Sequence, residues 1–335
     1  MTDAATGSAT GPASGSATDP ATGLTAYRSP LLDLPGAVDG EGVDAGVPWH
    51  YGHPVEEQRR LESGAGWVDL SHRDVVRLAG PDRLQLLHAM TTQHLAALPA
   101  GEWTEALVLS PHGHVEHQFA GVDDGEAFLA HTEPGQGSGL IEFLTSMRFL
   151  LRVEIDAVDD LAVIARPDGA HFVPRTALAE LPADLGPPSG TWAHEALRIA
   201  AGRPRLGLDT DHRTIPNEVG WIGTAVHMDK GCYRGQETVA RVHTLGRPPR
   251  RLVLLHLDGS ADRLPALGSP LMLDGRQVGR VGSTARHHEL GPVGLGLVKR
   301  SVSPDVELLA DEVAASQEVV VDPEVGLHVR PRLRD

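Results

Sequence analysis

The sequence predicts an α+β protein whose C-terminal part forms a separate all-β domain. Between positions 66 and 250, short apolar runs typical of strands alternate with apolar residues at helical spacing. Two prolines and three arginines at positions 246–251 then mark a boundary. Beyond it, apolar residues alternate with polar residues and glycines, which predicts strands. We therefore expect a small β-barrel or sandwich at 251–330.

The elements before this boundary are expected from local patterns. Val75, Val76 and Leu78 predict a strand, and Pro81 suits the first turn of the helix that follows. The turn residues at 110–113 separate two apolar runs and predict a hairpin. The other expected elements are a strand at 128–130, a helix at 139–150, a strand from 153, a linker at 182–190 and a helix at 191–201.

Composition limits the classes of partner. The chain has 29 Lys and Arg against 45 Asp and Glu, for a net charge of −16, which argues against direct nucleic-acid binding and against anionic membranes. No apolar run approaches the roughly 20 residues that span a bilayer. Residues 1–25 are dominated by Ala, Thr, Gly, Ser and Pro and are predicted to be a disordered tail, followed by a main region at 26–250.

The cysteine count bears on compartment and chemistry. Because Cys232 is the only cysteine, internal disulfides are excluded and a reducing, cytoplasmic setting is expected. One thiol also cannot hold an iron–sulfur cluster alone, since clusters usually need about four protein ligands.

The strongest motif is the run Lys-Gly-Cys-Tyr-Arg-Gly-Gln-Glu at 230–237. Gly231 and Gly235 lie on either side of Cys232 and would let a ligand approach the backbone closely. A buried, inert cysteine beside a glycine-rich turn is an equally simple interpretation, because free cysteines are commonly buried.

Charge around this thiol favours reactivity. Lys230 and Arg234 place positive charge beside Cys232, and positive neighbours favour the thiolate. Gln236 and Glu237 are expected to begin a helix, where a carboxylate suits the positive end of the dipole.

At these residues the sequence resembles a known family. The run 230–237 is similar to the Lys-Gly-Cys-Tyr-x-Gly-Gln-Glu signature of the YgfZ family, which is related to mitochondrial iron–sulfur assembly factors. From about 49 to 330, the chain resembles the glycine-cleavage T-protein, or aminomethyltransferase, superfamily. Weaker matches in the same order are Asp69-Leu70-Ser71-His72, positions 80–98, Leu197-Arg198-Ile199, Ile215-Pro216-Asn217-Glu218 and Gly279-Arg280-Val281-Gly282-Ser283.

The resemblance implies a ring of two α+β lobes and a C-terminal β-barrel, with tetrahydrofolate in the central hole. It implies reduced folate and iron–sulfur client or assembly proteins as partners, with indirect effects on tRNA modification. It implies a functional thiol, Cys232, within a motif formed by Lys230, Gly231, Cys232, Tyr233, Gly235, Gln236, Glu237 and Arg241. The implied folate contacts are Glu218, Trp221 and Gln236, although Trp221 is more simply a core aromatic.

Two positions depart from the T-protein pattern. His117 and Gln118 stand where T-proteins carry an acidic pair, and strand alternation would turn the neighbouring Glu116 to the other face. Ala200 stands where T-proteins usually have a folate-binding Glu. The first departure argues against T-protein catalysis, and the second changes the expected pterin contacts.

Histidines and arginines outside the motif are weaker candidates. His112 and His114 would share a strand face and His117 would not, and 18 histidines make such clusters common by chance, so no metal site is predicted. His287-His288-Glu289 is expected in a loop that is solvated or packed against the ligand hole. The arginines at 247, 250 and 251 predict a solvated interdomain loop or a docking point for folate's glutamate tail.

Three functions remain open from the sequence. The leading hypothesis is a tetrahydrofolate-binding accessory protein for iron–sulfur protein assembly or repair, in which Cys232 acts beside the folate and no enzymatic turnover is needed. The alternative is a folate-dependent aminomethyltransferase-like one-carbon transferase. A third is a thiol redox protein, which would need a resolving thiol on a partner because the chain has no second cysteine.

Overall fold

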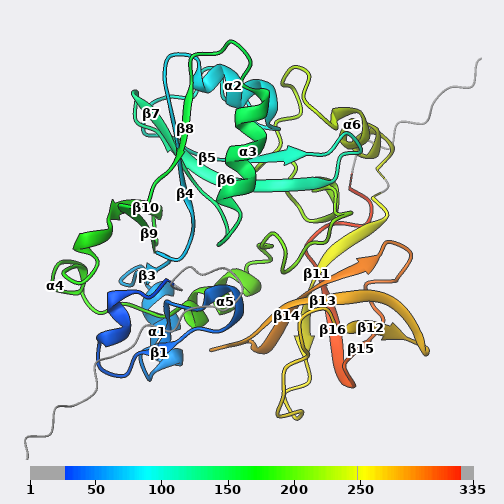
Figure 1. Ribbon diagram of the computed structural model, residues 1–335. Coiled ribbons are helices and arrows are strands. Elements are labelled where there is room, and N and C mark those ends of the chain that lie inside the picture. Colours follow the sequence, from blue (N-terminus) through cyan, green and yellow to red (C-terminus); the bar gives the residue numbers. More distant parts are fainter. Residues whose placement is uncertain (1–26, 247, 326–335) are drawn as a thin grey trace, which may run out of the picture.

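The computed structural model describes residues 27–246 and 248–325 and forms three parts (Figure 1). The tail expected at 1–25 and Arg247 of the expected arginine loop lie outside the described residues. The predicted α+β fold with a C-terminal barrel is confirmed. Within the described ranges, no helix has both the length and the apolar character needed to cross a membrane.

The first lobe is a five-stranded sheet in the order β5-β6-β7-β4-β8, covered on one face by two helices (Figure 1). Apolar side chains of both helices pack onto that face and form its core. The elements are β4 (Val75–Ala79), α2 (Arg83–Met90), β5 (Trp103–Leu109), β6 (Val115–Asp123), β7 (Ala127–His131), α3 (Gly137–Met147) and β8 (Glu154–Ala157).

The second lobe surrounds a three-stranded sheet in the order β10-β9-β3. Helix α5 has buried residues on several of its sides, because it packs both on this lobe and on the barrel strands β13 and β14. The elements are η1 (Pro30–Asp33), β1 (Val38–Asp39), η2 (Gly42–Asp44), β2 (Pro48–His50), α1 (Pro54–Glu62), β3 (Val68–Asp69), β9 (Leu161–Arg166), β10 (Gly169–Pro174), η3 (Arg175–Ala177), α4 (Leu181–Leu185) and α5 (Thr191–Ala200).

The third part is a closed barrel in the order β11-β14-β13-β12-β15-β16 with its own apolar core. The segment between α5 and the barrel contains η4 (Pro216–Glu218) and α6 (Gln236–Leu245), the helix expected to begin at position 236. The strands are β11 (Arg250–Leu257), β12 (Pro270–Leu273), β13 (Arg276–His287), β14 (Gly291–Lys299), β15 (Leu308–Ala310) and β16 (Val313–Val319).

Three local predictions are corrected. The helix expected at 139–150 ends at Met147, because Phe149 adopts a positive φ of 48° that an α-helix does not allow. The expected linker at 182–190 contains α4. Arg250 and Arg251 are not in a solvated loop: both begin β11, and Arg251 is fully buried against the carbonyl oxygens of Lys299 and Arg300.

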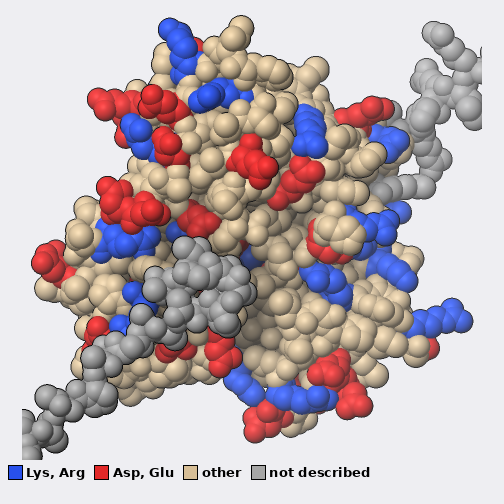
Figure 2. Space-filling view, viewed as in Figure 1, with Lys and Arg blue, Asp and Glu red and all other residues tan. Residues whose placement is uncertain are grey.

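A buried ion network connects the lobes and the barrel. Arg205 lies 3.0 Å from Asp44, 2.6 Å from Glu133 and 3.1 Å from Glu195. The second arginine of the network, Arg198, pairs with Glu195 at 2.8 Å and with Asp209 at 2.9 Å, and donates a hydrogen bond to the barrel residue Ser283. These contacts fix α5 against both neighbouring parts. By contrast, the charges on the face in Figure 2 are interspersed, with acidic and basic side chains side by side.

We expect Arg205→Met to lower the free energy of unfolding by about 3–5 kcal/mol, because it leaves several carboxylates buried without their cation. Arg263→Met is the matched control, since Arg263 is half exposed in its pairs with Asp311 and Glu312 and should change stability by no more than about 1 kcal/mol. Urea unfolding followed by circular dichroism measures both. Equal stability of the parent and Arg205→Met would contradict a structural role for the network.

Acid should weaken the same network. Burial alone would raise the pKa of Glu195, but the charges of Arg198 and Arg205 outweigh it and lower that pKa to about 2. The ion pair therefore contributes its full stability above the ordinary value of 4.5 and loses it as the pH falls towards 2. Unfolding measured between pH 6 and 2 should show a shallower acid slope for Arg205→Met than for the parent, and parallel slopes would argue against this linkage.

Candidate functional site

A cavity of about 1340 Å³ lies between the two lobes. Its wall is formed by one face of the β5–β6 sheet, the β9–β10 turn, the C-terminal end of α5 and positions 219–227. Small-molecule sites usually occupy about 300–1000 Å³, so this cavity can hold a cofactor-sized ligand with room beside it.

Alternation along β5 and β6 decides which side chains face the cavity. Glu105 and Gln118 line it, whereas Ala106 and Phe119 point to the opposite face and the helix-covered core. The two cavity residues are diagonal neighbours, because Glu105 pairs with Ala120 and Gln118 pairs with the residue two positions further along β5.

His117 faces away from the cavity. Its ring lies 6.2 Å from that of Phe143 on α3, and burial lowers its pKa. Of the two positions at which the sequence departs from the T-protein acidic pair, only Gln118 therefore reaches the cavity. The carboxyl group on this wall is that of Glu105, which the sequence reasoning missed.

Glu105 and Arg203 are unpaired groups of opposite charge in the inner recess of the cavity. Among the described residues, neither side chain has a hydrogen bond or an ion pair. Burial raises the pKa of Glu105, and the charges of Arg203 and Arg73 only partly oppose this. Two neighbouring histidines on the cavity wall are neutral at physiological pH, because burial lowers the pKa of His131 to about 3 and that of His194 to about 4.

Lys230 anchors the cysteine loop to the first lobe. Its buried ammonium group donates to the carbonyl oxygens of His88 and Thr91, at the C-terminal end of α2. Cations stabilise the negative end of a helix, so the motif's lysine acts as a helix cap. Burial lowers its pKa to about 8.

Cys232 is exposed, which excludes the interpretation of a buried, inert thiol. It lies in the loop before α6 and does not line the cavity. Arg234 forms an ion pair with Glu116 at 3.0 Å. Tyr233 is buried, and the Lys230 ammonium group lies over its ring. Neither flanking cation is therefore dedicated to the thiol.

The two motif glycines serve different purposes. Gly235 has a φ of 79°, and a Cβ atom there would lie 2.6 Å from the carbonyl oxygen of Ser110 and 2.9 Å from the Cα of Gly113. The close approach expected for a ligand is thus made at Gly235 by the turn of the β5–β6 hairpin. At Gly231 a Cβ would meet nothing within 4 Å, so this position is open.

The remaining implied folate contacts are spread over the structure. Trp221 lines the cavity and is also part of the buried core. Glu218 does not line it: its carboxylate is fully buried, caps the backbone N–H of Ile215 and pairs with Arg250 at 2.8 Å. Gln236 begins α6 beside Lys230 and also lies outside the cavity lining. The exposed motif residues Glu237 and Arg241 lie one turn apart on α6.

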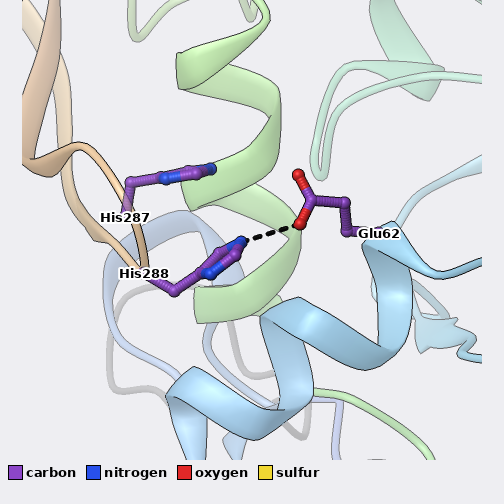
Figure 3. A group of neighbouring side chains, drawn as sticks. All are labelled: Glu62, His287 and His288. Carbon is purple, nitrogen blue, oxygen red and sulfur yellow. Dashed lines mark hydrogen bonds and ion pairs between the residues drawn. The ribbon is translucent and has the colours of Figure 1, made fainter.

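His287, His288 and Glu62 lie close together (Figure 3), and of the three only Glu62 lines the cavity. His288 Nε2 lies 2.9 Å from Glu62, and the two histidine rings stack at 4.7 Å. His287 Nδ1 accepts the backbone N–H groups of Glu289 and Leu290, so its proton sits on Nε2 and that atom has no lone pair for a metal. The group thus connects α1 to the β13–β14 hairpin.

The fold is that of aminomethyltransferase T. The crystal structure of the glycine cleavage system aminomethyltransferase T from Bartonella henselae superposes with a TM-score of 0.74 over 88% of this chain and 97% of that chain, at 17% identity. This likeness confirms the predicted T-protein-like arrangement of lobes and barrel. No family model matches the chain.

Sequence relatives agree with the fold. The chain is 26% identical over 324 residues to an aminomethyltransferase of Synechococcus sp. (strain WH7803), covering 78% of this chain and 87% of the relative. It is also 25% identical over 329 residues to a chloroplastic protein of Arabidopsis thaliana, and the match covers 82% of this chain and 74% of that protein. The name of that protein gives its transferase activity as provisional. These similarities support the T-protein superfamily and leave the narrower YgfZ assignment a prediction.

We expect Gly235→Ala to lower the free energy of unfolding by about 1–3 kcal/mol, because alanine is strained at this positive φ and its Cβ meets the hairpin turn. Gly231→Ala is the matched control within the same loop and should change stability by less than about 0.5 kcal/mol. Thermal and urea unfolding measure both variants. Equal effects at the two glycines would contradict the packing role assigned to Gly235.

Proposed function

We propose that the chain binds a reduced folate in the central cavity and acts as an accessory protein in iron–sulfur protein assembly or repair, with Cys232 as its functional thiol. The observation that carries the proposal is the T-protein fold with a cavity of about 1340 Å³ between its lobes. The cavity wall combines Trp221 with the hydrogen-bonding groups of Gln118, Glu105 and Arg203, which suits a flat heterocycle with polar edges.

The iron–sulfur role rests on the motif at 230–237 and on the exposure of Cys232. A thiol on the outer surface of an anchored loop can meet a cluster or a thiol of a client protein, which a buried thiol cannot. Effects on tRNA modification would follow indirectly, through modifying enzymes that carry clusters. A cytoplasmic location belongs to the same proposal.

The alternative function is folate-dependent one-carbon transfer. The similarity to aminomethyltransferases over most of the chain favours it, and the cavity has room for a second substrate beside a folate. In this case Glu105 would be the carboxyl group nearest the chemistry. Turnover of a defined one-carbon donor would establish this function over the accessory role.

Folate binding is tested by calorimetry with tetrahydrofolate. We expect the parent and Cys232→Ala to bind with the same affinity, because Cys232 does not line the cavity. Ala120→Phe, which places a large side chain on the cavity wall, should abolish binding and serves as the blocked control. Absence of binding by the parent would refute the folate part of the proposal.

The role of the thiol is tested in cells that lack this protein. The parent should restore the activity of an iron–sulfur enzyme, Cys232→Ala should not, and Ser260→Ala, on an exposed loop of the barrel, should behave as the parent. Enzyme activity is measured per amount of enzyme protein, with the level of each variant checked by immunoblot. Full restoration by Cys232→Ala would refute the accessory role and leave the folate-binding result standing.

A further inference from the structure

We propose that Glu105 and Arg203 together form the subsite that binds the 2-amino-4-oxopyrimidine edge of a pterin. The inference rests on the proposed function and deepens it, because it assigns the polar end of the ligand to two residues that no sequence motif includes. It follows from the placement of two unpaired, opposite charges in one cavity.

Glu105 is held rigidly but its carboxyl group has no partner. It lies in the middle of β5, where its backbone is paired with Ala120 of β6. The side chain is exposed to the cavity, and partial desolvation by the surrounding protein raises its pKa. An unpaired carboxyl group that faces a cavity can accept N–H groups from a ligand in place of water.

Arg203 is held equally firmly from the other wall. It follows α5, and its backbone exchanges two hydrogen bonds with Arg198: the Arg203 N–H donates to the Arg198 carbonyl, and the Arg203 carbonyl accepts from the Arg198 guanidinium. Its own guanidinium group lines the cavity without an ion pair to any described residue. Arg203 and Glu105 line the same recess, and no ion pair joins them among the described residues.

The other charged groups facing this recess already have partners. Arg73 pairs with Glu133 at 3.4 Å, and Glu133 pairs with Arg205 at 2.6 Å. The neighbouring rings of His131 and His194 are neutral, because burial lowers their pKa values. Glu105, Arg203 and the amide of Gln118 are therefore the groups in this recess that are left for a ligand, within the part of the chain described here.

The arrangement selects a neutral ring with donors and an acceptor on one edge. A carboxylate accepts two parallel N–H groups, here the ring N–H and the exocyclic amine, and a guanidinium donates to the adjacent carbonyl oxygen. The carboxylates of folate's glutamate tail would be repelled by Glu105. A pterin edge satisfies both residues at once, which the tail cannot do.

The test is calorimetry with 5-formyltetrahydrofolate and with p-aminobenzoylglutamate, which lacks the pterin. We expect Glu105→Gln to bind 5-formyltetrahydrofolate about 10- to 100-fold more weakly than the parent, and Arg203→Met to lose a similar factor. Both variants should bind p-aminobenzoylglutamate as the parent does. Glu126→Gln, which removes a carboxylate from the exposed β6–β7 turn, is the matched control and should bind as the parent.

The pH dependence gives a readout that misfolding would not produce. Only the ionised carboxyl group accepts two N–H groups, so the parent should lose affinity as the pH falls, beginning above the ordinary glutamate value of 4.5 because the pKa of Glu105 is raised. Arg73, Glu133, His131, His194 and Arg203 face the same recess in both proteins. The difference between the parent and Glu105→Gln therefore isolates the contribution of Glu105.

The outcomes separate the two proposals. Parent-like binding of 5-formyltetrahydrofolate by Glu105→Gln, or an equal loss for both ligands, would overturn the subsite and leave folate binding intact. Absence of binding by the parent would overturn the proposed folate function and the subsite together. Selective loss for the pterin-containing ligand, with a flattened pH profile, would establish the subsite.

Discussion

The structure depends on the placement of two arginines, Arg198 and Arg205, among four buried carboxylates. Each part of the molecule contributes at least one partner: Glu133 follows the first lobe's sheet, Glu195 belongs to α5, and Ser283 is in the barrel. Buried charges are costly unless each finds an opposite charge, so the network tolerates few relative positions of the three parts. This requirement, added to the apolar cluster that they share, holds the cavity open between the lobes.

Two charged residues beside this network are not part of it. Glu105 and Arg203 lie beside the network but are not paired within it, although each is attached to a rigid element. Both side chains are exposed to the cavity and have no partner among the described residues, which is the placement on which the proposed pterin subsite rests.

Local signals in the sequence predicted much of the fold. The sequence was sufficient to predict the hairpin around positions 110–113, the helix beginning at Gln236 and the C-terminal barrel. Turn residues and alternation are patterns that extend over only a few positions. Features that depend on residues far away in the sequence could not be predicted in this way. Arg250 reads as part of a loop but is a strand residue paired with Glu218, 32 positions earlier. Phe149 ends a helix through a backbone angle that its own sequence does not require.

The candidate site was predictable only in part, for the same reason. The motif around Cys232 was recognisable because its residues are contiguous. Glu105 could have been found by extending the strand alternation that places it on the face of Gln118, but which face meets the cavity and which meets the helices is decided by tertiary packing. Nothing in the sequence around Arg203 marks it as a site residue. Its place in the recess depends on how α5 packs in the folded chain.

The β5–β6 hairpin joins the two chemical regions of the molecule. Its strands carry Glu105 and Gln118 on the cavity wall, and its turn packs directly on Gly235 at the end of the cysteine loop. At the loop's other end, Lys230 donates to the C-terminal end of α2, the helix between β4 and β5 of the same sheet. The proposed folate site and the surface thiol are therefore carried by elements that pack directly on one another, which is why a change in the hairpin sequence bears on both regions.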